Sequence, residues 1–180
     1  DAPAFYNTLL SNKSLTPRNE FKILIIGAGG VAPSILWAAK KLTSTSGEIY
    51  ITNRTKQKAI SLLREIDQQR IPQDTSERKI NILDWGEIPD VNLVINTTSV
   101  GLIKEERLSL DFKKFSNNKN ILFYDLIYNP KETSFLNDAN KRGNKIMNGR
   151  MMFLLQAADA FYQWTKKNVE INDEVIKLLD

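Results

Sequence analysis

The segment at residues 27–32, with the sequence GAGGVA, has a spacing that points to a specific chemistry. It fits the pattern G-x-G-x-x-A, whose first glycine turns the chain out of a strand and whose second lets the backbone approach a pyrophosphate. The helix that follows such a turn offers free N–H groups and a positive dipole end to phosphates. The alternative is a plain structural turn between strand and helix. The predicted dinucleotide-binding residues here are Gly27, Ala28, Gly29, Gly30, Val31 and Ala32.

A basic cluster follows the next predicted strand. Dinucleotide-binding domains that prefer NAD usually carry an acidic residue there, which accepts hydrogen bonds from the ribose 2′-hydroxyl, and residues 52–58 contain none. Arg54 offers a planar fork of donors suited to a 2′-phosphate, and Lys58 lies one helical turn further on the same side. Asn53 and Thr55 add neutral hydrogen-bonding groups. The cluster predicts NADP rather than NAD, against the alternative of a solvated basic loop.

A third polar segment comes directly after the fourth predicted strand. Polar residues at the carboxyl end of a strand lie on the edge where open α/β sheets bind their ligands. We therefore expect this segment to contact the cofactor, and a hydrogen-bonded turn is the alternative. Its residues are Asn96, Thr97, Thr98, Ser99, Val100 and Gly101.

Composition excludes several kinds of site. The 180 residues contain no Cys and no His, which excludes thiolate metal sites, a Cys nucleophile and a Ser-His-Asp triad. Acid–base chemistry must come from Asp, Glu, Lys or Tyr. The net charge of +4 is spread along the chain, which argues against a nucleic-acid partner. No apolar run approaches the roughly 20 residues that cross a membrane, so we expect a cytoplasmic protein with no membrane partner.

These segments need a scaffold of alternating strands and helices. Short apolar runs predict strands at 22–26, 48–52, 80–83, 93–96, 121–125 and 145–147, and helical spacing predicts helices at 31–42, 56–67 and 133–142. A polar loop is expected at 68–78. This alternation predicts the α/β class: a Rossmann-type open parallel sheet with helices on both faces.

Further helices are expected on either side of this scaffold, at 5–10, 151–166 and 173–179. We interpret residues 1–20 as a linker helix region, 21–150 as the NADP-binding domain and 151–180 as C-terminal helices. Because the chain starts with Asp rather than Met, we expect it to begin within a longer protein.

Taken together, the motifs resemble the shikimate dehydrogenase family, whose members reduce 3-dehydroshikimate to shikimate with NADPH in aromatic amino-acid biosynthesis. The resemblance spans nearly the whole chain, with five motifs in the family's order. They are GAGG at 27–30, NRT at 53–55, NTTSVG at 96–101, YDLIYNP at 124–130 followed by Thr133, and NGRMM at 148–152 followed by QAA at 156–158 and Phe161.

The resemblance implies further site residues. Asp1 stands where the family has the Asp of its catalytic Lys–Asp pair, while the Lys belongs to an N-terminal substrate domain that this sequence lacks. Gln156 and Tyr128 match residues that contact the substrate, and Gly149 and Met152 would line the nicotinamide side. The alternative is that these residues have no role in a site and are ordinary helix, loop or core residues. The implied partners are shikimate or 3-dehydroshikimate together with that N-terminal domain, and we also expect self-association into a homodimer.

Several residues depart from the family pattern. Ala2 and Ala4, with Pro3 between them, replace expected glycines, Asn148 replaces an Asp, and Pro33 replaces an Arg after the glycine loop. These changes keep open a second function, a non-catalytic nucleotide-binding or interaction remnant of the family. A third, a glutamyl-tRNA reductase-like or methylene-tetrahydrofolate dehydrogenase-like enzyme, is disfavoured by the segments around Tyr128 and Gln156. We expect this portion alone to be inactive.

Overall fold

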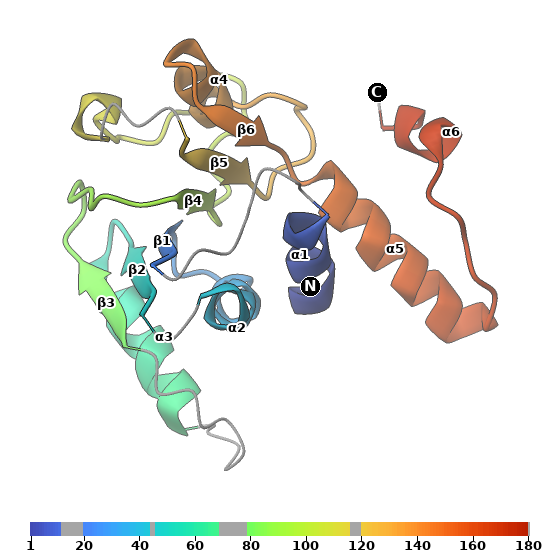
Figure 1. Ribbon diagram of the computed structural model, residues 1–180, viewed down its shortest axis with the longest axis horizontal. Helices are drawn as coiled ribbons and strands as arrows, with labels where there is room; N and C mark the ends of the chain where they lie inside the picture. The colour runs from blue at the N-terminus through green and yellow to red at the C-terminus, as the bar shows by residue number, and fades with distance from the viewer. Residues whose placement is uncertain (12–19, 44–45, 69–78, 116–119, 180) are drawn as a thin grey trace.

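A six-stranded parallel sheet forms the centre of the computed structural model, which describes residues 1–11, 20–43, 46–68, 79–115 and 120–179 (Figure 1). The strands lie in the order β3-β2-β1-β4-β5-β6, which is the order of the Rossmann fold and confirms the predicted class. Their bounds are β1 (Lys22–Ile26), β2 (Glu48–Thr52), β3 (Ile80–Leu83), β4 (Leu93–Asn96), β5 (Leu122–Asp125) and β6 (Lys145–Met147).

The middle strands are apolar on both faces because helices or loops cover both sides of the sheet. Ile25 of β1 lies opposite Ile51 of β2 and Ile95 of β4, and all three side chains are fully buried. Each such isoleucine contributes about 1.5–3 kcal/mol through burial. This central core holds the carboxyl ends of β1, β2 and β4 in a fixed register, and the predicted cofactor segments follow those ends.

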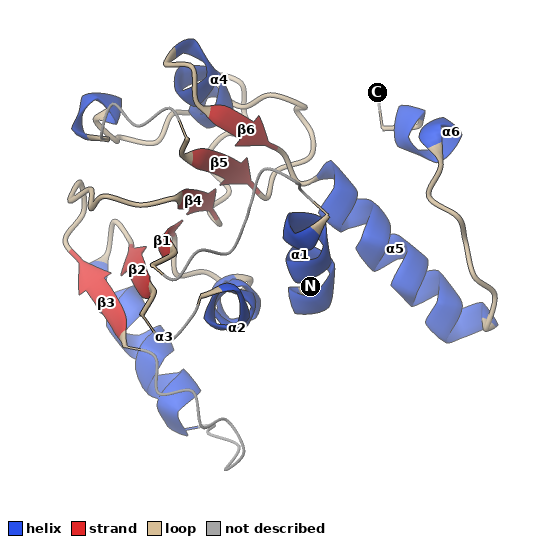
Figure 2. Cartoon of the chain, in the orientation of Figure 1, coloured by secondary structure: helices blue, strands red, loops and turns tan. Residues whose placement is uncertain are grey.

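The two faces of the sheet are covered differently (Figure 2). One face packs against α1 (Ala2–Leu10), α2 (Ala32–Leu42), α3 (Lys56–Gln68) and the start of α5 (Arg150–Thr165). The other face packs against α4 (Ser134–Lys141), the short 3-10 helix η1 (Phe112–Lys114) and their flanking loops. The prediction of helices on both faces is therefore confirmed.

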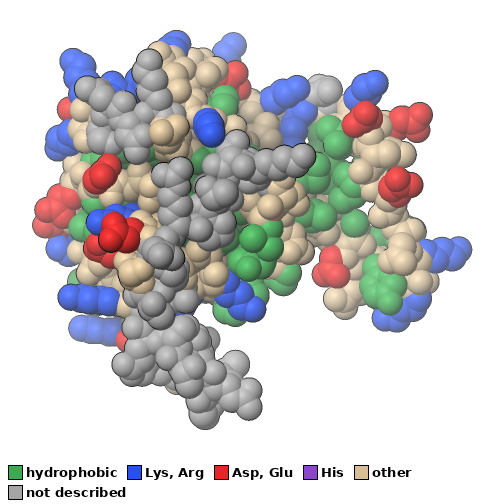
Figure 3. Space-filling model, viewed as in Figure 1, with side chains coloured by type: hydrophobic (Ala, Val, Ile, Leu, Met, Phe, Trp, Pro, Cys, Tyr) green, Lys and Arg blue, Asp and Glu red, His purple; other side chains and the backbone are tan. Residues whose placement is uncertain are grey.

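The first helix, α1, joins the Rossmann core to α5. It contacts α2 and α5, and its buried Phe5 meets the ring of Tyr124 on β5 edge to face, with the ring centroids 5.0 Å apart. The second half of α5 extends away from the sheet, and the chain then turns back, so that α6 (Asp173–Lys177) lies toward the start of α5 (Figure 1). There the Arg150 side chain donates to the Leu179 carbonyl. Hydrophobic side chains are visible along α5 in the space-filling view (Figure 3), and Trp164 is 84% exposed.

Most predicted elements are present with small shifts at their ends. The strand expected at 121–125 begins at Leu122, and the helix expected at 5–10 begins at Ala2, with Asp1 as its N-cap. The 3-10 helix was not predicted, and the loop expected at 68–78 lies almost wholly outside the described residues. None of the helices in the described ranges has both the length and the hydrophobicity needed to cross a membrane.

Candidate cofactor-binding site

The glycine loop (residues 27–30) and the segment after β4 (residues 96–101) meet at the point of the sheet where the direction of the strand order reverses. β1 and β4 are neighbours, yet the chain leaves β1 toward β2 and leaves β4 toward β5, so a crevice forms beyond their carboxyl ends in folds of this topology. The Thr97 backbone N–H donates to the Ile26 carbonyl at 2.9 Å. The Thr97 hydroxyl also lies 3.0 Å from the Ile26 oxygen and 3.2 Å from the Gly27 oxygen, to which it donates. Two of the three predicted cofactor segments are thus joined by hydrogen bonds.

Gly27 is required by both its conformation and its surroundings. Its φ of +112° is strained for any residue with a side chain. A Cβ at this position would lie 2.6 Å from the Thr97 hydroxyl oxygen and 2.8 Å from a methyl carbon of Thr98. The turn therefore depends on the absence of a side chain, as the fingerprint predicts.

Gly29 and Gly30 stand in open, exposed positions. A Cβ built on either would meet no atom within 4 Å. Within the described part of the chain, the backbone N–H groups of Gly29, Gly30 and Val31 make no hydrogen bond. These donors are available to an anion at the exposed end of the loop.

The start of α2 adds to this phosphate-binding character. Val31 is the N-cap and supplies no side-chain capping bond, Pro33 stands in the first turn, and that turn contains no acidic residue. Ala32 is fully buried against the sheet, which is the packing role the fingerprint predicts for it. No side chain of this turn consequently neutralises the positive end of the helix dipole.

The basic cluster lies at the carboxyl end of β2. Arg54 and Lys58 are exposed, and neither forms an ion pair with any residue that the structure describes. Lys56, between them in sequence, is different, because its Nζ lies 2.6 Å from a carboxylate oxygen of Asp84. Two cations of the cluster therefore remain available for a phosphate. Thr55 is also exposed and its carbonyl accepts from the Lys58 N–H at 3.0 Å.

Asn53 differs from its exposed neighbours because its side chain is already hydrogen-bonded within the protein. Its Oδ1 accepts from the Ala28 N–H at 3.1 Å, and its Nδ2 donates to the Thr55 carbonyl at 2.8 Å. The predicted contact of this side chain with the cofactor stays a prediction, but its two protein partners are clear. Asn53 connects the glycine loop with the basic cluster.

The segment after β4 is organised by the buried side chain of Asn96. Its Oδ1 accepts from the backbone N–H and the hydroxyl of Thr98, at 3.0 and 2.7 Å. Its Nδ2 donates to the Val100 carbonyl at 3.3 Å and to Asp125 at 3.0 Å. Asn96 and Thr98 thus shape the turn, whereas Ser99 is exposed on it.

Asp125, at the end of β5, was missed as part of the site. Its carboxylate accepts from Asn96 and, at 3.1 Å, from the Ile127 N–H, and the Thr133 hydroxyl donates a third bond at 2.6 Å. Burial raises the pKa of Asp125 to about 6, against the effect of these three hydrogen bonds. The signal in the sequence was an acidic residue at the carboxyl end of a buried apolar strand.

The raised pKa of Asp125 predicts a pH-dependent stability. Because its folded-state pKa of about 6 exceeds its ordinary value of 3.8, its stabilising contribution is full below pH 3.8 and is lost as the pH rises through 6. We expect the unfolding free energy of the wild type, relative to that of Asp125→Asn, to fall by about 2 kcal/mol between pH 4.5 and 7. Urea unfolding of both proteins at several pH values measures this difference, and a difference that does not change with pH contradicts it.

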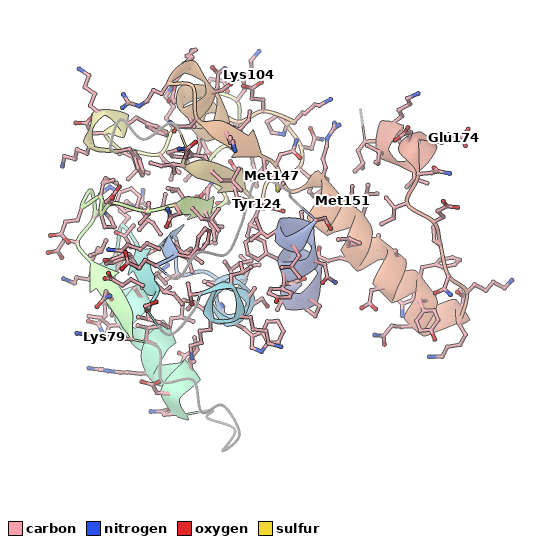
Figure 4. The ribbon with its side chains drawn as sticks, viewed as in Figure 1. Lys79, Lys104, Tyr124, Met147, Met151 and Glu174 are labelled. Atoms are coloured by element: carbon pink, nitrogen blue, oxygen red, sulfur yellow. The ribbon has the colours of Figure 1, made fainter. Side chains whose placement is uncertain are left out.

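Two of the residues implied by the family resemblance lie in contact. The Gln156 side-chain amide, on α5, donates to a carboxylate oxygen of Asp1, at the start of α1. In Figure 4 the labelled Tyr124 marks β5 and the labelled Met151 marks the start of α5. Helix α1 contacts both of these elements. The predicted catalytic Asp and the predicted substrate-binding Gln are therefore brought together across 155 residues of sequence.

The remaining predicted residues surround the start of α5. Tyr128 stacks on Phe153, with ring centroids 4.3 Å apart and planes 18° from parallel, and is 38% exposed. Met152 is 6% exposed and packs in the core that contains α1 and α2. Gly149 is the N-cap of α5, and a Cβ there would lie 2.0 Å from the Leu126 carbonyl oxygen. Their roles toward substrate and cofactor stay predictions.

Comparison with known proteins decides the family. No protein-family model matches the chain. The NADP(+)-dependent shikimate dehydrogenase of Pelagibacter ubique is 43% identical over 159 residues, which is 88% of this chain and 54% of that protein. The shikimate dehydrogenase of Shouchella clausii is 34% identical over 99% of this chain and 62% of its own length. This chain belongs to the shikimate dehydrogenase family.

Solved shikimate dehydrogenases also share its fold. One in complex with NADP+ superimposes with a TM-score of 0.76 at 28% identity, covering 99% of this chain and 59% of that one. The enzyme of Thermus thermophilus, in complex with NADP(H) and shikimate, gives 0.73 at 26% identity, covering 94% and 57%. The chain thus spans about half the length of the shikimate dehydrogenases that it matches.

Proposed function

We propose that this chain is the NADP-binding portion of a shikimate dehydrogenase that catalyses the reversible, NADPH-dependent reduction of 3-dehydroshikimate to shikimate. The observation that carries the proposal is a glycine-rich turn at the start of a helix together with two cations that form no ion pair within the described residues. Gly29 and Gly30 present free N–H groups at the start of α2, and Arg54 and Lys58 have no carboxylate partner among the described residues. Both features suit phosphates, at two positions on one nucleotide.

These residues fit NADP better than NAD. A 2′-phosphate carries close to two negative charges, which an acidic residue after β2 would repel and which Arg54 attracts. Residues 52–58 contain no acid, and the Asp84 carboxylate is bound to Lys56. In this proposal Arg54 and Lys58 hold the 2′-phosphate and the N–H groups of Gly29 and Gly30 hold the pyrophosphate.

The segment after β4 and the start of α5 would then face the nicotinamide half. Asn96, Thr97 and Thr98 hold this edge in shape, which leaves Ser99 exposed on it. When bound, NADPH supplies the hydride that reduces the substrate carbonyl. Met152, which is buried in the first turn of α5, would support that side of the site.

Asp1, Gln156 and Tyr128 are proposed to act on the substrate. Asp1 would hold and move a proton at the reacting oxygen of the substrate. Gln156, whose side-chain amide donates to the Asp1 carboxylate, would orient that carboxylate. Tyr128 lies flat against Phe153, which precedes Gln156 by three residues on α5. The missing member of the proton-transfer pair is expected in an N-terminal domain, the proposed partner of residues 151–180.

The interactions of the complete protein are part of the same proposal. Phe161, Tyr162 and Trp164 on the second half of α5 are exposed, and large exposed apolar side chains are typical of a surface that meets a partner. We propose that this surface meets the N-terminal domain or, in its absence, a second copy. The division of the chain at residues 20 and 150, and the cytoplasmic location, stay predictions.

Titration of the chain with NADPH and with NADH, followed by nucleotide fluorescence, tests the proposal. We expect NADPH to bind at least tenfold more tightly, because only NADPH carries the 2′-phosphate. Equal affinities, or no binding of either nucleotide, would contradict it. A second assay joins the chain to an N-terminal substrate domain and follows shikimate-dependent formation of NADPH. If no NADPH forms although NADPH still binds, the alternative of a non-catalytic remnant is favoured.

A further inference from the structure

We propose that Asn53 is a positioning residue, whose side-chain amide joins the glycine loop to the turn that carries Arg54 and so aligns the two phosphate-binding parts of the site. The inference rests on the proposed function for its consequences in cofactor binding. Its structural basis is independent of that function, and it assigns Asn53 a role through the protein rather than through direct contact with the 2′-phosphate.

The amide bridges two segments at the point where backbone pairing of the strands stops. β1 and β2 pair through Ile26 and Thr52, and the last backbone bond runs from the Gly27 N–H to the Thr52 carbonyl at 2.8 Å. The next link is made by a side chain, because Asn53 Oδ1 accepts from the Ala28 N–H at 3.1 Å. Asn53 therefore continues the connection between the two strands into the loops that follow them.

The second bond of Asn53 fixes its own side chain. Its Nδ2 donates to the Thr55 carbonyl at 2.8 Å, which closes the turn around Arg54 before α3 begins at Lys56. An amide is needed for both bonds, since one end must accept and the other must donate. Aspartate retains the acceptor but has no donor for Thr55, and alanine has neither group.

This arrangement predicts a distinctive effect on affinity. The Ala28 N–H belongs to the loop that would hold the pyrophosphate, and NADPH and NADH share that group. Loss of the bridge should therefore weaken both nucleotides, whereas loss of a direct 2′-phosphate contact would weaken NADPH alone. Arg54→Ala provides the matched control, because Arg54 has no protein partner among the described residues and its removal leaves the bridge intact.

Asn53→Ala tests the proposal by fluorescence titration with both nucleotides. We expect the dissociation constants for NADPH and NADH to rise together, each by about five- to tenfold, with their ratio preserved within twofold. In Arg54→Ala only the NADPH constant should rise. If Asn53→Ala loses affinity for NADPH alone, the proposal is overturned in favour of a direct contact with the 2′-phosphate. If both dissociation constants are unchanged, the bridge does not position the phosphate-binding groups and the proposal is also overturned.

Hydrogen exchange at the Ala28 amide gives a readout that needs no nucleotide. We expect exchange at this amide to be accelerated at least fivefold in Asn53→Ala and to stay near the wild-type rate in Asn53→Asp, which keeps the acceptor. If the wild type binds neither nucleotide, the proposed function fails while this measurement still decides the bridge. Equal exchange in wild type and Asn53→Ala overturns the bridge itself.

Discussion

Replacing Arg54 with alanine is expected to weaken NADPH binding by roughly ten- to a hundredfold while leaving NADH binding unchanged. A charge-assisted, two-pronged pair between a guanidinium and a phosphate contributes about 1.5–3 kcal/mol. Arg54 is exposed and forms no ion pair within the described residues, so its removal costs little in the free protein. The loss should therefore fall on the phosphorylated nucleotide alone.

Calorimetric titration at fixed salt with both nucleotides measures this loss. Lys113→Ala is a suitable control, because it removes an equal charge from an exposed position in η1, on the other face of the sheet. We expect that variant to bind NADPH within twofold of the wild type. An NADPH/NADH affinity ratio that survives Arg54→Ala would remove Arg54 from the site.

Gly149→Ala is expected to produce the largest loss of stability among these substitutions, about 3 kcal/mol or more. The new Cβ would lie 2.0 Å from the Leu126 carbonyl oxygen and 2.6 Å from its carbon, and both atoms belong to backbone. The Gly149 N–H donates to the Ile127 carbonyl at 3.1 Å, so the chain cannot move away without losing that bond. Thermal unfolding should shift downward by on the order of 10 °C.

Gly29→Ala is the matched comparison, because it adds the same methyl group where no atom lies within 4 Å. Its stability should stay within about 0.5 kcal/mol of the wild type. Nucleotide binding should nevertheless weaken, since the methyl group stands where the pyrophosphate would approach. A stable Gly149→Ala protein, or a Gly29→Ala protein with full affinity, would contradict the roles assigned to these two glycines.

The scaffold of the site was predictable because its signals are local. The run Lys22–Ile26 followed by a glycine turn specifies a buried strand and a helix start without reference to the rest of the chain. The same holds for Glu48–Thr52 and Leu93–Asn96, whose bounds agree with the prediction. Arg54 and Lys58 could be placed near the loop because parallel strands end at one edge of the sheet.

The hydrogen-bond partners could not be predicted, because they depend on which strands become neighbours. Asn96 meets Asp125 only because the strand order places β4 beside β5, and those residues are 29 apart in sequence. The contact of Gln156 with Asp1 depends on the packing of α1 against α5. The close approach of Gly149 to Leu126 depends on the path of the chain after β6. Sequence periodicity carries no information on such contacts.

Competition between two small nucleotides tests the central claim most directly. Adenosine 2′,5′-bisphosphate and adenosine 5′-monophosphate differ by one 2′-phosphate, so the ratio of their affinities for the wild-type chain isolates the contribution of the basic cluster. We predict that the bisphosphate binds at least tenfold more tightly at physiological ionic strength, and that this advantage disappears in Arg54→Ala. Equal binding of the two nucleotides by the wild type would contradict a 2′-phosphate site at Arg54 and Lys58.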